Sequence, residues 1–155
     1  MANTYSQIYL QIVISVNGRQ NLLHKSWRKK LFTYMAGIVN SKNHKCITIN
    51  GVADHVHLFI GLNPSEAISD LVRDVKNNSS NFIIDNKLVN GKFSWQAGYG
   101  VFSYSQSNIN NVFQYISNQE EHHKSISFKD EYVKFLNEYQ ISYQDKYLFE
   151  MYDID

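Results

Sequence analysis

A pair of histidines has the type and spacing that metal chemistry requires. His55 and His57 stand two residues apart in the apolar segment HVHLFIG. Alternate side chains of a strand leave the same face, so both imidazoles would point one way while Val56 points the other. Neutral imidazoles bind divalent metal ions, and a strand fixes their separation better than a loop does. Taken alone, the pair is equally compatible with two structural histidines on a half-buried sheet face.

A tyrosine and a glutamine form a second candidate pair. Tyr115 and Gln119 are four residues apart, so that on one helix they would lie on the same side. They stand at the edge of the apolar stripe that predicts this helix, which consists of Ile109, Val112, Phe113 and Ile116. The stripe would anchor the helix while the pair faces a site. The alternative is that Tyr115, one of eleven tyrosines, merely flanks the core.

The elements expected to position these residues follow the order β-α-β-β-α-β. Apolar residues at period two predict a strand over residues 8–16, and shorter apolar runs predict strands at 47–49, 55–62 and 101–104, with a turn at 50–54. Helices are expected at 24–39 and from Pro64 onward, with Ser65 as a cap. This order favours an α+β fold, the ferredoxin-like β-α-β-β-α-β sandwich with an antiparallel sheet and both helices on one face.

Further helices should follow the last strand. The helix of Tyr115 is the third, and Ser127 with Asp130 resembles a capping box that opens a fourth. These C-terminal helices would carry the tyrosine. The polar segment 77–90 is ambiguous, and we interpret it as a frayed helix end followed by a surface loop.

The composition indicates one domain, residues 1–155. The chain is 43% hydrophobic and has one proline, which argues against disorder. Cys46 is the only cysteine, so no intrachain disulfide and no thiolate metal cluster can form within one subunit. We find no apolar run long enough to cross a membrane and no signal peptide in residues 1–7, so we expect a cytoplasmic protein without membrane contact.

The charge is unevenly distributed along the chain. Residues 1–100 carry 11 Lys and Arg against 5 Asp and Glu, whereas residues 101–155 carry 4 against 9. A basic surface on the first part could bind phosphates while the acidic tail packs elsewhere. Trp27 or Trp95 could stack on unpaired bases, although helix-face cations are often merely solvated and Trp95 could equally belong to the core. The candidate phosphate-binding residues are Arg28, Lys29, Lys30, Arg73 and Lys76.

Three segments in this order give the chain a family resemblance: residues 54–59 (DHVHLF), 95–103 (WQAGYGVFS) and 115–123 (YISNQEEHH). Over nearly its whole length, the chain resembles the single-tyrosine transposases of minimal bacterial insertion sequences. These belong to the insertion sequence 200 and 605 type, within the histidine-hydrophobe-histidine (HUH) superfamily. The resemblance implies one HUH transposase domain that acts on single-stranded DNA.

The resemblance also implies a role for each candidate residue. His55 and His57 match the paired metal ligands, Gln119 the third ligand and Tyr115 the nucleophile, while His122 and His123 match no ligand. It implies Mg²⁺ as the metal, and a neutral shell of two imidazoles and one amide would also admit Mn²⁺. Hairpins near the element ends, and a homodimer whose sites are completed in trans by the partner's tyrosine helix, are further implications.

The chemistry of the residues agrees with these roles. A phenol with a pKa of roughly 10 is a poor nucleophile at neutral pH unless the phosphate that it attacks is polarised. A divalent ion can polarise that phosphate. The products would be a 5′-phosphotyrosyl link and a free 3′-hydroxyl, and because one phosphoester replaces another, rejoining needs no nucleotide. In agreement, the sequence has no G-x-x-x-x-G-K-[ST] loop.

Three alternatives remain open from the sequence. A domesticated, repeat-associated tyrosine transposase acting on palindromic repeats would have the same active site. A non-catalytic single-stranded nucleic-acid-binding module would need exposed aromatic residues on its central strands. A small metal-dependent hydrolase would need the histidines but not Tyr115.

Overall fold

Four antiparallel strands form the sheet that positions the histidines. In the computed structural model, which describes residues 3–143, the strands are β1 (Tyr9–Ser15), β2 (Lys45–Gly51), β3 (His55–Gly61) and β4 (Gly100–Tyr104). Their order in the sheet is β2-β3-β1-β4, and every neighbouring pair is antiparallel. The predicted ferredoxin-like sandwich with its antiparallel sheet is therefore confirmed.

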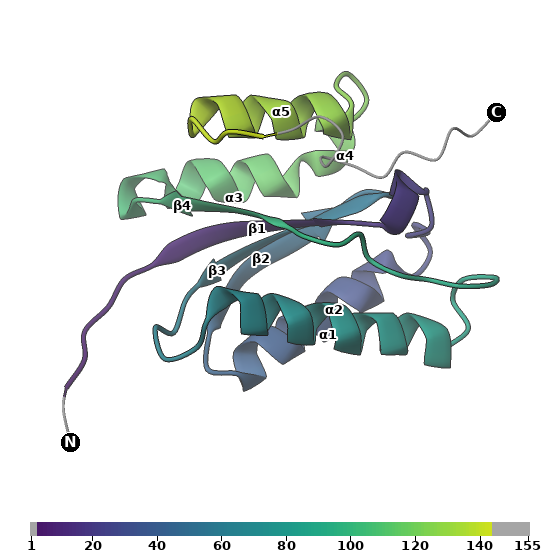
Figure 1. Cartoon of the computed structure of the whole chain (residues 1–155), viewed down its shortest axis with the longest axis horizontal. Helices are drawn as coiled ribbons and strands as arrows, with labels where there is room; N and C mark the ends of the chain where they lie inside the picture. The colour runs from purple at the N-terminus through teal and green to yellow at the C-terminus, as the bar shows by residue number, and fades with distance from the viewer. Residues whose placement is uncertain (1–2, 144–155) are drawn as a thin grey trace.

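Helices cover both faces of this sheet (Figure 1). On one side lie α1 (Arg28–Ser41) and α2 (Ile68–Asp85), and on the other lie α3 (Ile109–Ser117), α4 (Gln119–His122) and α5 (Phe128–Glu138). Short 3-10 turns follow β1 at Asn17–Arg19 and β4 at Gln106–Asn108. Both central strands, β1 and β3, are buried along nearly their whole length. The described strands therefore offer no open aromatic platform, which contradicts the nucleic-acid-binding module as an RNA-type sheet reader.

The period-two pattern assigns alternate residues of the central strands to two different layers. The main core lies between the sheet and α1 and α2, and its members from β1, β3 and the two helices include Leu10, Ile12, Ile14, Val56, Leu58, Ile60, Leu31, Met35, Leu71 and Val75. The alternate residues face the other layer, where Val13 packs against Phe128 of α5 and Phe59 against Ile116 of α3. Burial on both faces fixes the strand register, because a slip by one residue would exchange the two sets.

The two crossover helices begin later than predicted. Residues 24–27 form a turn in which the His24 ring accepts from the Ser26 backbone N–H at 3.4 Å, and such local contacts compete with helix formation. Ser65 is not a cap: Ala67 precedes α2, and the Ser65 N–H donates to the Asn63 side chain. The segment 77–90 is mostly helical rather than frayed, because buried Ser79 and Ile83 hold α2 against the core as far as Asp85.

The C-terminal helices differ from the prediction in two respects. Tyr115 and Gln119 do not share one regular helix, because α3 ends at Ser117 and Gln119 is the first residue of α4. Phe113, counted in the apolar stripe, is 39% exposed. The capping prediction is confirmed, since the Ser127 side chain accepts from the Asp130 backbone N–H at the start of α5.

Among residues 3–143, none of the helices combines the length and apolar character needed to span a bilayer. Part of the acidic tail inferred from the sequence lies outside the described residues, namely Asp145, Glu150, Asp153 and Asp155.

Candidate metal and nucleophile site

Strand β3 presents both histidines to the layer of α3, α4 and α5. His55 and His57 are fully buried, and their ring centroids are 5.0 Å apart. Val56 between them belongs to the core on the opposite face, as the alternation predicts. Strand β1 pairs with β3 so that Val13 lies opposite His57, which brings Gln11, on the same face of β1, beside the His57 ring. The pairing of two central strands thus builds the floor of the site.

The Nδ1 atom of both His55 and His57 contacts a side-chain oxygen. Nδ1 of His55 lies 2.7 Å from Asp54 Oδ1, and Nδ1 of His57 lies 2.7 Å from Gln11 Oε1. The Gln11 amide nitrogen donates to the Tyr104 hydroxyl, so the amide oxygen faces the histidine. Each acceptor favours the tautomer in which Nδ1 carries the hydrogen. Both Nε2 atoms are then left with lone pairs that point away from the strand.

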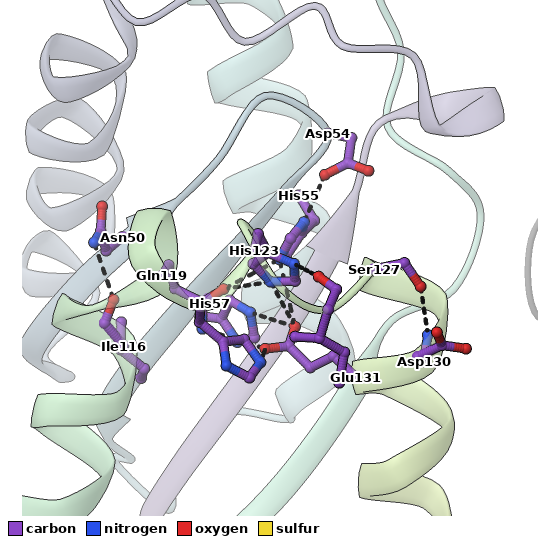
Figure 2. A network of polar contacts seen from close by, with 12 residues as sticks. Asn50, Asp54, His55, His57, Ile116, Gln119, His123, Ser127, Asp130 and Glu131 are labelled. Carbon is purple, nitrogen blue, oxygen red and sulfur yellow. Dashed lines mark hydrogen bonds and ion pairs between the residues drawn. The ribbon is translucent and has the colours of Figure 1, made fainter.

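The Nε2 atoms meet side chains from α4 and α5 (Figure 2). Nε2 of His55 lies 3.2 Å from Gln119 Oε1, and both are fully buried. Nε2 of His57 is buried and has no hydrogen bond among the described residues. Glu131 of α5, 2% exposed, places Oε1 3.5 Å from Nε2 of His55 and 3.2 Å from Nε2 of His57. A set of buried lone pairs that includes an orphan nitrogen fits a cation, so the residues present fit the expected metal ion.

His123 joins the same cluster. Its Nε2 lies 3.0 Å from Gln119 Oε1 and 3.2 Å from Glu131 Oε1. One ligand atom from each of four residues, His55, His57, His123 and Glu131, falls within 4.8 Å of the others. The family resemblance assigns His123 no ligand role, and no sequence pattern marks Glu131, so that only the structure places these two residues in the cluster.

The electrostatics favour positive charge at the centre of the cluster. Burial by itself lowers the pKa of His55, but contacts with the Asp54 and Glu131 carboxylates outweigh burial and raise the pKa above its ordinary value. Burial lowers the pKa of His57 despite its contact with Glu131, and burial lowers the pKa of His123 to about 4. Although burial opposes it, the nearby histidines hold the pKa of Glu131 below its ordinary value. A divalent ion would supply the charge that these carboxylates favour.

Tyr115 approaches the cluster from α3. Its hydroxyl donates to Glu131 Oε2 and lies 3.3 Å from Nε2 of His122, and its ring meets the His57 ring edge-on with centroids 6.1 Å apart. Tyr115 is only partly buried and lines a cavity of about 540 Å³ between β4, α3 and α5, which Glu131 and Lys134 also line. The hydroxyl therefore faces both the histidine cluster and an open cavity, and it belongs to the same chain as the histidines.

A second cavity also borders the cluster. It holds about 710 Å³ and is lined by His123 and Asp54 as well as by the cations Arg19 and Lys25. The cluster thus borders two cavities, one lined by Tyr115 and one lined by Arg19 and Lys25.

Most of the predicted phosphate-binding cations have partners within the chain. Arg28 is buried and donates to Glu120 at 2.7 Å, Arg73 pairs with two neighbouring aspartates, and Lys76 donates to two backbone carbonyls near Gly98. Lys29 and Lys30 are exposed. Arg73 and Lys76 belong to α2, which covers the opposite face of the sheet from the histidines (Figure 1).

The expectation that a tryptophan stacks on unpaired bases is wrong for both candidates. Trp27 and Trp95 are each 8% exposed and belong to the main core. The Trp95 indole donates to Ser79 Oγ at 2.9 Å, so its polar atom also has a partner within the chain.

Comparisons with known proteins agree with this fold. The family model described as Transposase IS200 like matches residues 4–119. A structure from Deinococcus radiodurans, described as that of a transposase, superposes with a TM-score of 0.62 and 21% identity over 77% of this chain and 95% of that chain. A REP-associated tyrosine transposase bound to a REP hairpin superposes with a TM-score of 0.57 and 14% identity, over 81% of this chain and 74% of that one. At these identities, the two structures show a shared fold. No curated protein matches the sequence.

Proposed function

Because this chain belongs to the family of IS200-like transposases, we propose that it cleaves and rejoins single-stranded DNA with Tyr115 as the nucleophile. The Tyr115 oxygen forms a bond to the scissile phosphorus while the bond from phosphorus to the 3′ oxygen breaks. The products are a 5′-phosphotyrosyl link and a 3′-hydroxyl that has taken up a proton. Attack by a 3′-hydroxyl on the phosphotyrosine reverses the exchange and rejoins the strand.

One observation carries this proposal: the Tyr115 hydroxyl lies beside the histidine cluster and in the wall of an open cavity. A phosphate that entered this cavity could contact the phenol without any rearrangement of the sheet. Glu131 and His122 hold the hydroxyl by its hydrogen bonds, which restricts the rotation of the ring. Such fixed geometry favours an in-line attack.

His55, His57 and Gln119 would hold a divalent ion, Mg²⁺ or Mn²⁺, in the buried cluster. When bound, the ion would withdraw charge from a non-bridging phosphate oxygen and so favour attack by the phenol. The chain's own contribution is to orient the ligands: Asp54 and Gln11 fix the tautomers of His55 and His57.

The two cavities and the family match support single-stranded DNA as the partner. Single-stranded DNA could pass the site from the basic cavity at Arg19 and Lys25 toward the cavity of Tyr115 and Lys134. Phosphate contacts of this kind need no base recognition, so a hairpin would have to supply the specificity. The likeness to a transposase bound to a REP hairpin supports hairpin DNA as the partner. A repeat-associated role is compatible with the same site.

A covalent adduct on a denaturing gel tests the proposal. The protein is mixed with labelled single-stranded hairpin oligonucleotides, taken from the DNA that flanks its gene, and with Mg²⁺ or Mn²⁺. We expect an adduct with the wild-type chain and with Tyr34→Phe, a control on the opposite helical layer, and none with Tyr115→Phe or in a chelator. Nicked DNA that persists in Tyr115→Phe would support the hydrolase instead, and an adduct that persists there would refute the proposal.

Trans assembly of the site is a separate prediction. In the structure, Tyr115 contacts the cluster of its own chain. If a dimer exchanges tyrosine helices, a mixture of Tyr115→Phe and His57→Ala chains should recover adduct formation, because one mixed site is then intact. A site that stays within one chain gives no recovery.

A further inference from the structure

His123 and Glu131 share their surroundings with the three expected metal ligands. Their ligand atoms approach those of His55 and His57 to within 4.8 Å, and Gln119 Oε1 lies 3.0 Å from Nε2 of His123. Both residues lie beyond the segment 4–119 that matches the family. The match to the family model therefore does not bear on these two residues, and the case for them comes from their contacts in α4 and α5.

The hydrogen bond that Nδ1 of His123 makes leaves Nε2 of the same ring as an acceptor. Nδ1 of His123 lies 2.9 Å from the carbonyl oxygen of Ile126, so the hydrogen belongs on Nδ1. The same holds for His55 and His57, whose Nδ1 atoms face Asp54 and Gln11. Nε2 of all three rings then carries a lone pair that points to one place.

The oxygens around these nitrogens are acceptors as well. Glu131 Oε1 lies 3.2 Å from Nε2 of His57 and 3.2 Å from Nε2 of His123. The amide nitrogen of Gln119 donates to Glu131 Oε2 at 3.3 Å, which turns its Oε1 toward the imidazoles. Three nitrogens and two oxygens thus bring lone pairs together in a buried space. In a low dielectric, these lone pairs repel one another unless a cation lies between them.

Packing holds both added residues in place. The Phe128 ring at the start of α5 stacks on the His55 ring, with centroids 3.9 Å apart and planes 9° apart. The Ser127 cap and buried Leu136 fix the rest of α5, so Glu131 reaches the cluster from a docked helix. Glu131 is 2% exposed, and carboxylates are almost never buried unless they are paired. Its position in the cluster therefore indicates a partner for its charge.

We propose that His123 and Glu131 are ligands of the same ion, which three imidazoles, one amide and one carboxylate would then hold. The proposal rests on the proposed function for its ion and deepens that function. A shell with three nitrogens suits Mn²⁺ better than Mg²⁺, which prefers oxygen and keeps several waters. The remaining Glu131 oxygen accepts from Tyr115, so that one carboxylate joins the ion to the nucleophile.

Binding of Mn²⁺ to the metal-free full chain, without DNA, tests the ligands by a readout other than activity. Isothermal titration calorimetry gives the affinity, and the ¹⁴N electron spin-echo modulation of bound Mn²⁺ counts its imidazoles. The variants are Glu131→Gln and His123→Gln. Their matched controls are Glu121→Gln and His24→Gln, which change exposed residues outside the cluster. Circular dichroism checks that each variant is folded.

We expect one Mn²⁺ per chain, a Kd at least tenfold higher in Glu131→Gln and in His123→Gln, and wild-type binding in both controls. The modulation should indicate three imidazoles in the wild type and two in His123→Gln. A Kd within threefold of wild type in either folded variant, a count of two imidazoles in the wild type, or no Mn²⁺ binding without DNA would overturn the proposal. None of these outcomes decides whether the Tyr115 adduct forms. The adduct assay therefore detects a failure of the proposed function separately from a failure of these two ligands.

Discussion

Replacement of Gln11 by leucine tests whether the tautomer of His57 controls metal binding. Gln11 is fully buried, and its Oε1 lies 2.7 Å from Nδ1 of His57. Leucine has a similar size but no acceptor. His57 would then keep an unsatisfied Nδ1–H, or it would move the hydrogen to Nε2 and lose the lone pair that faces the ion.

The expected magnitude follows from this contact. A buried donor without a partner costs about 1–3 kcal/mol, so the free energy of unfolding of the metal-free chain should fall by that amount. Loss of an outer partner of a histidine ligand typically weakens metal binding by about 10–100-fold, which corresponds to about 1.4–2.7 kcal/mol. The Mn²⁺ affinity of Gln11→Leu should therefore fall in this range.

Gln11→Glu is the matched comparison. A carboxylate also accepts from Nδ1 of His57 and can accept from the Tyr104 hydroxyl, so this variant should keep the Mn²⁺ affinity of the wild type. Urea unfolding with and without Mn²⁺, together with calorimetry, measures both quantities. A folded Gln11→Leu chain that binds Mn²⁺ within threefold of wild type would refute the tautomer argument. So would equal loss in both variants.

Two further predictions follow from the site. The carboxylates of Asp54 and Glu131 raise the pKa of His55, so they favour a proton that Mn²⁺ must displace. The Mn²⁺ affinity should therefore rise as the pH increases through the pKa of His55 in the folded protein. Proton release should make the calorimetric heat depend on the buffer. Affinity independent of pH from pH 5 to 8 would contradict this assignment. Ser127→Ala removes the cap of α5 and should cost about 1 kcal/mol, or about 2–4 °C in Tm, whereas the exposed Ser6→Ala should cost nothing measurable. An unchanged melting curve and unchanged amide exchange in residues 128–138 would show that the cap does not hold the helix.

Local pattern was sufficient to predict the sheet and the direction of the paired histidines. The alternation from Ile8 to Val16 marks β1, and the same period separates His55 and His57 from Val56 on β3. Such assignments succeed because the side-chain direction in a strand depends on adjacent residues only. Helix starts were predicted less well, since α1 and α2 begin where tertiary burial, rather than a cap, stabilises the first turn.

The partners of the candidate site were decided by tertiary structure. Gln11 meets His57 across 46 residues, and the contact of Gln119 with His55 spans 64 residues. The sequence around Glu131 predicted only a capped helix. The apolar residues Phe128, Phe135 and Leu136 mark the face of that helix that packs, but nothing in the segment indicates that Glu131 meets the histidines of β3.

The sequence by itself therefore determined the order of helices and strands along the chain, the shared face of His55 and His57, and the family resemblance that marked Tyr115. Only the tertiary structure decided that Glu131 and His123 lie beside His55 and His57. It also decided that Arg28 pairs with Glu120 and that Trp95 is buried. The physical reason is that periodicity reports the backbone geometry of neighbours, whereas contacts between layers depend on how whole elements pack and bury their surfaces.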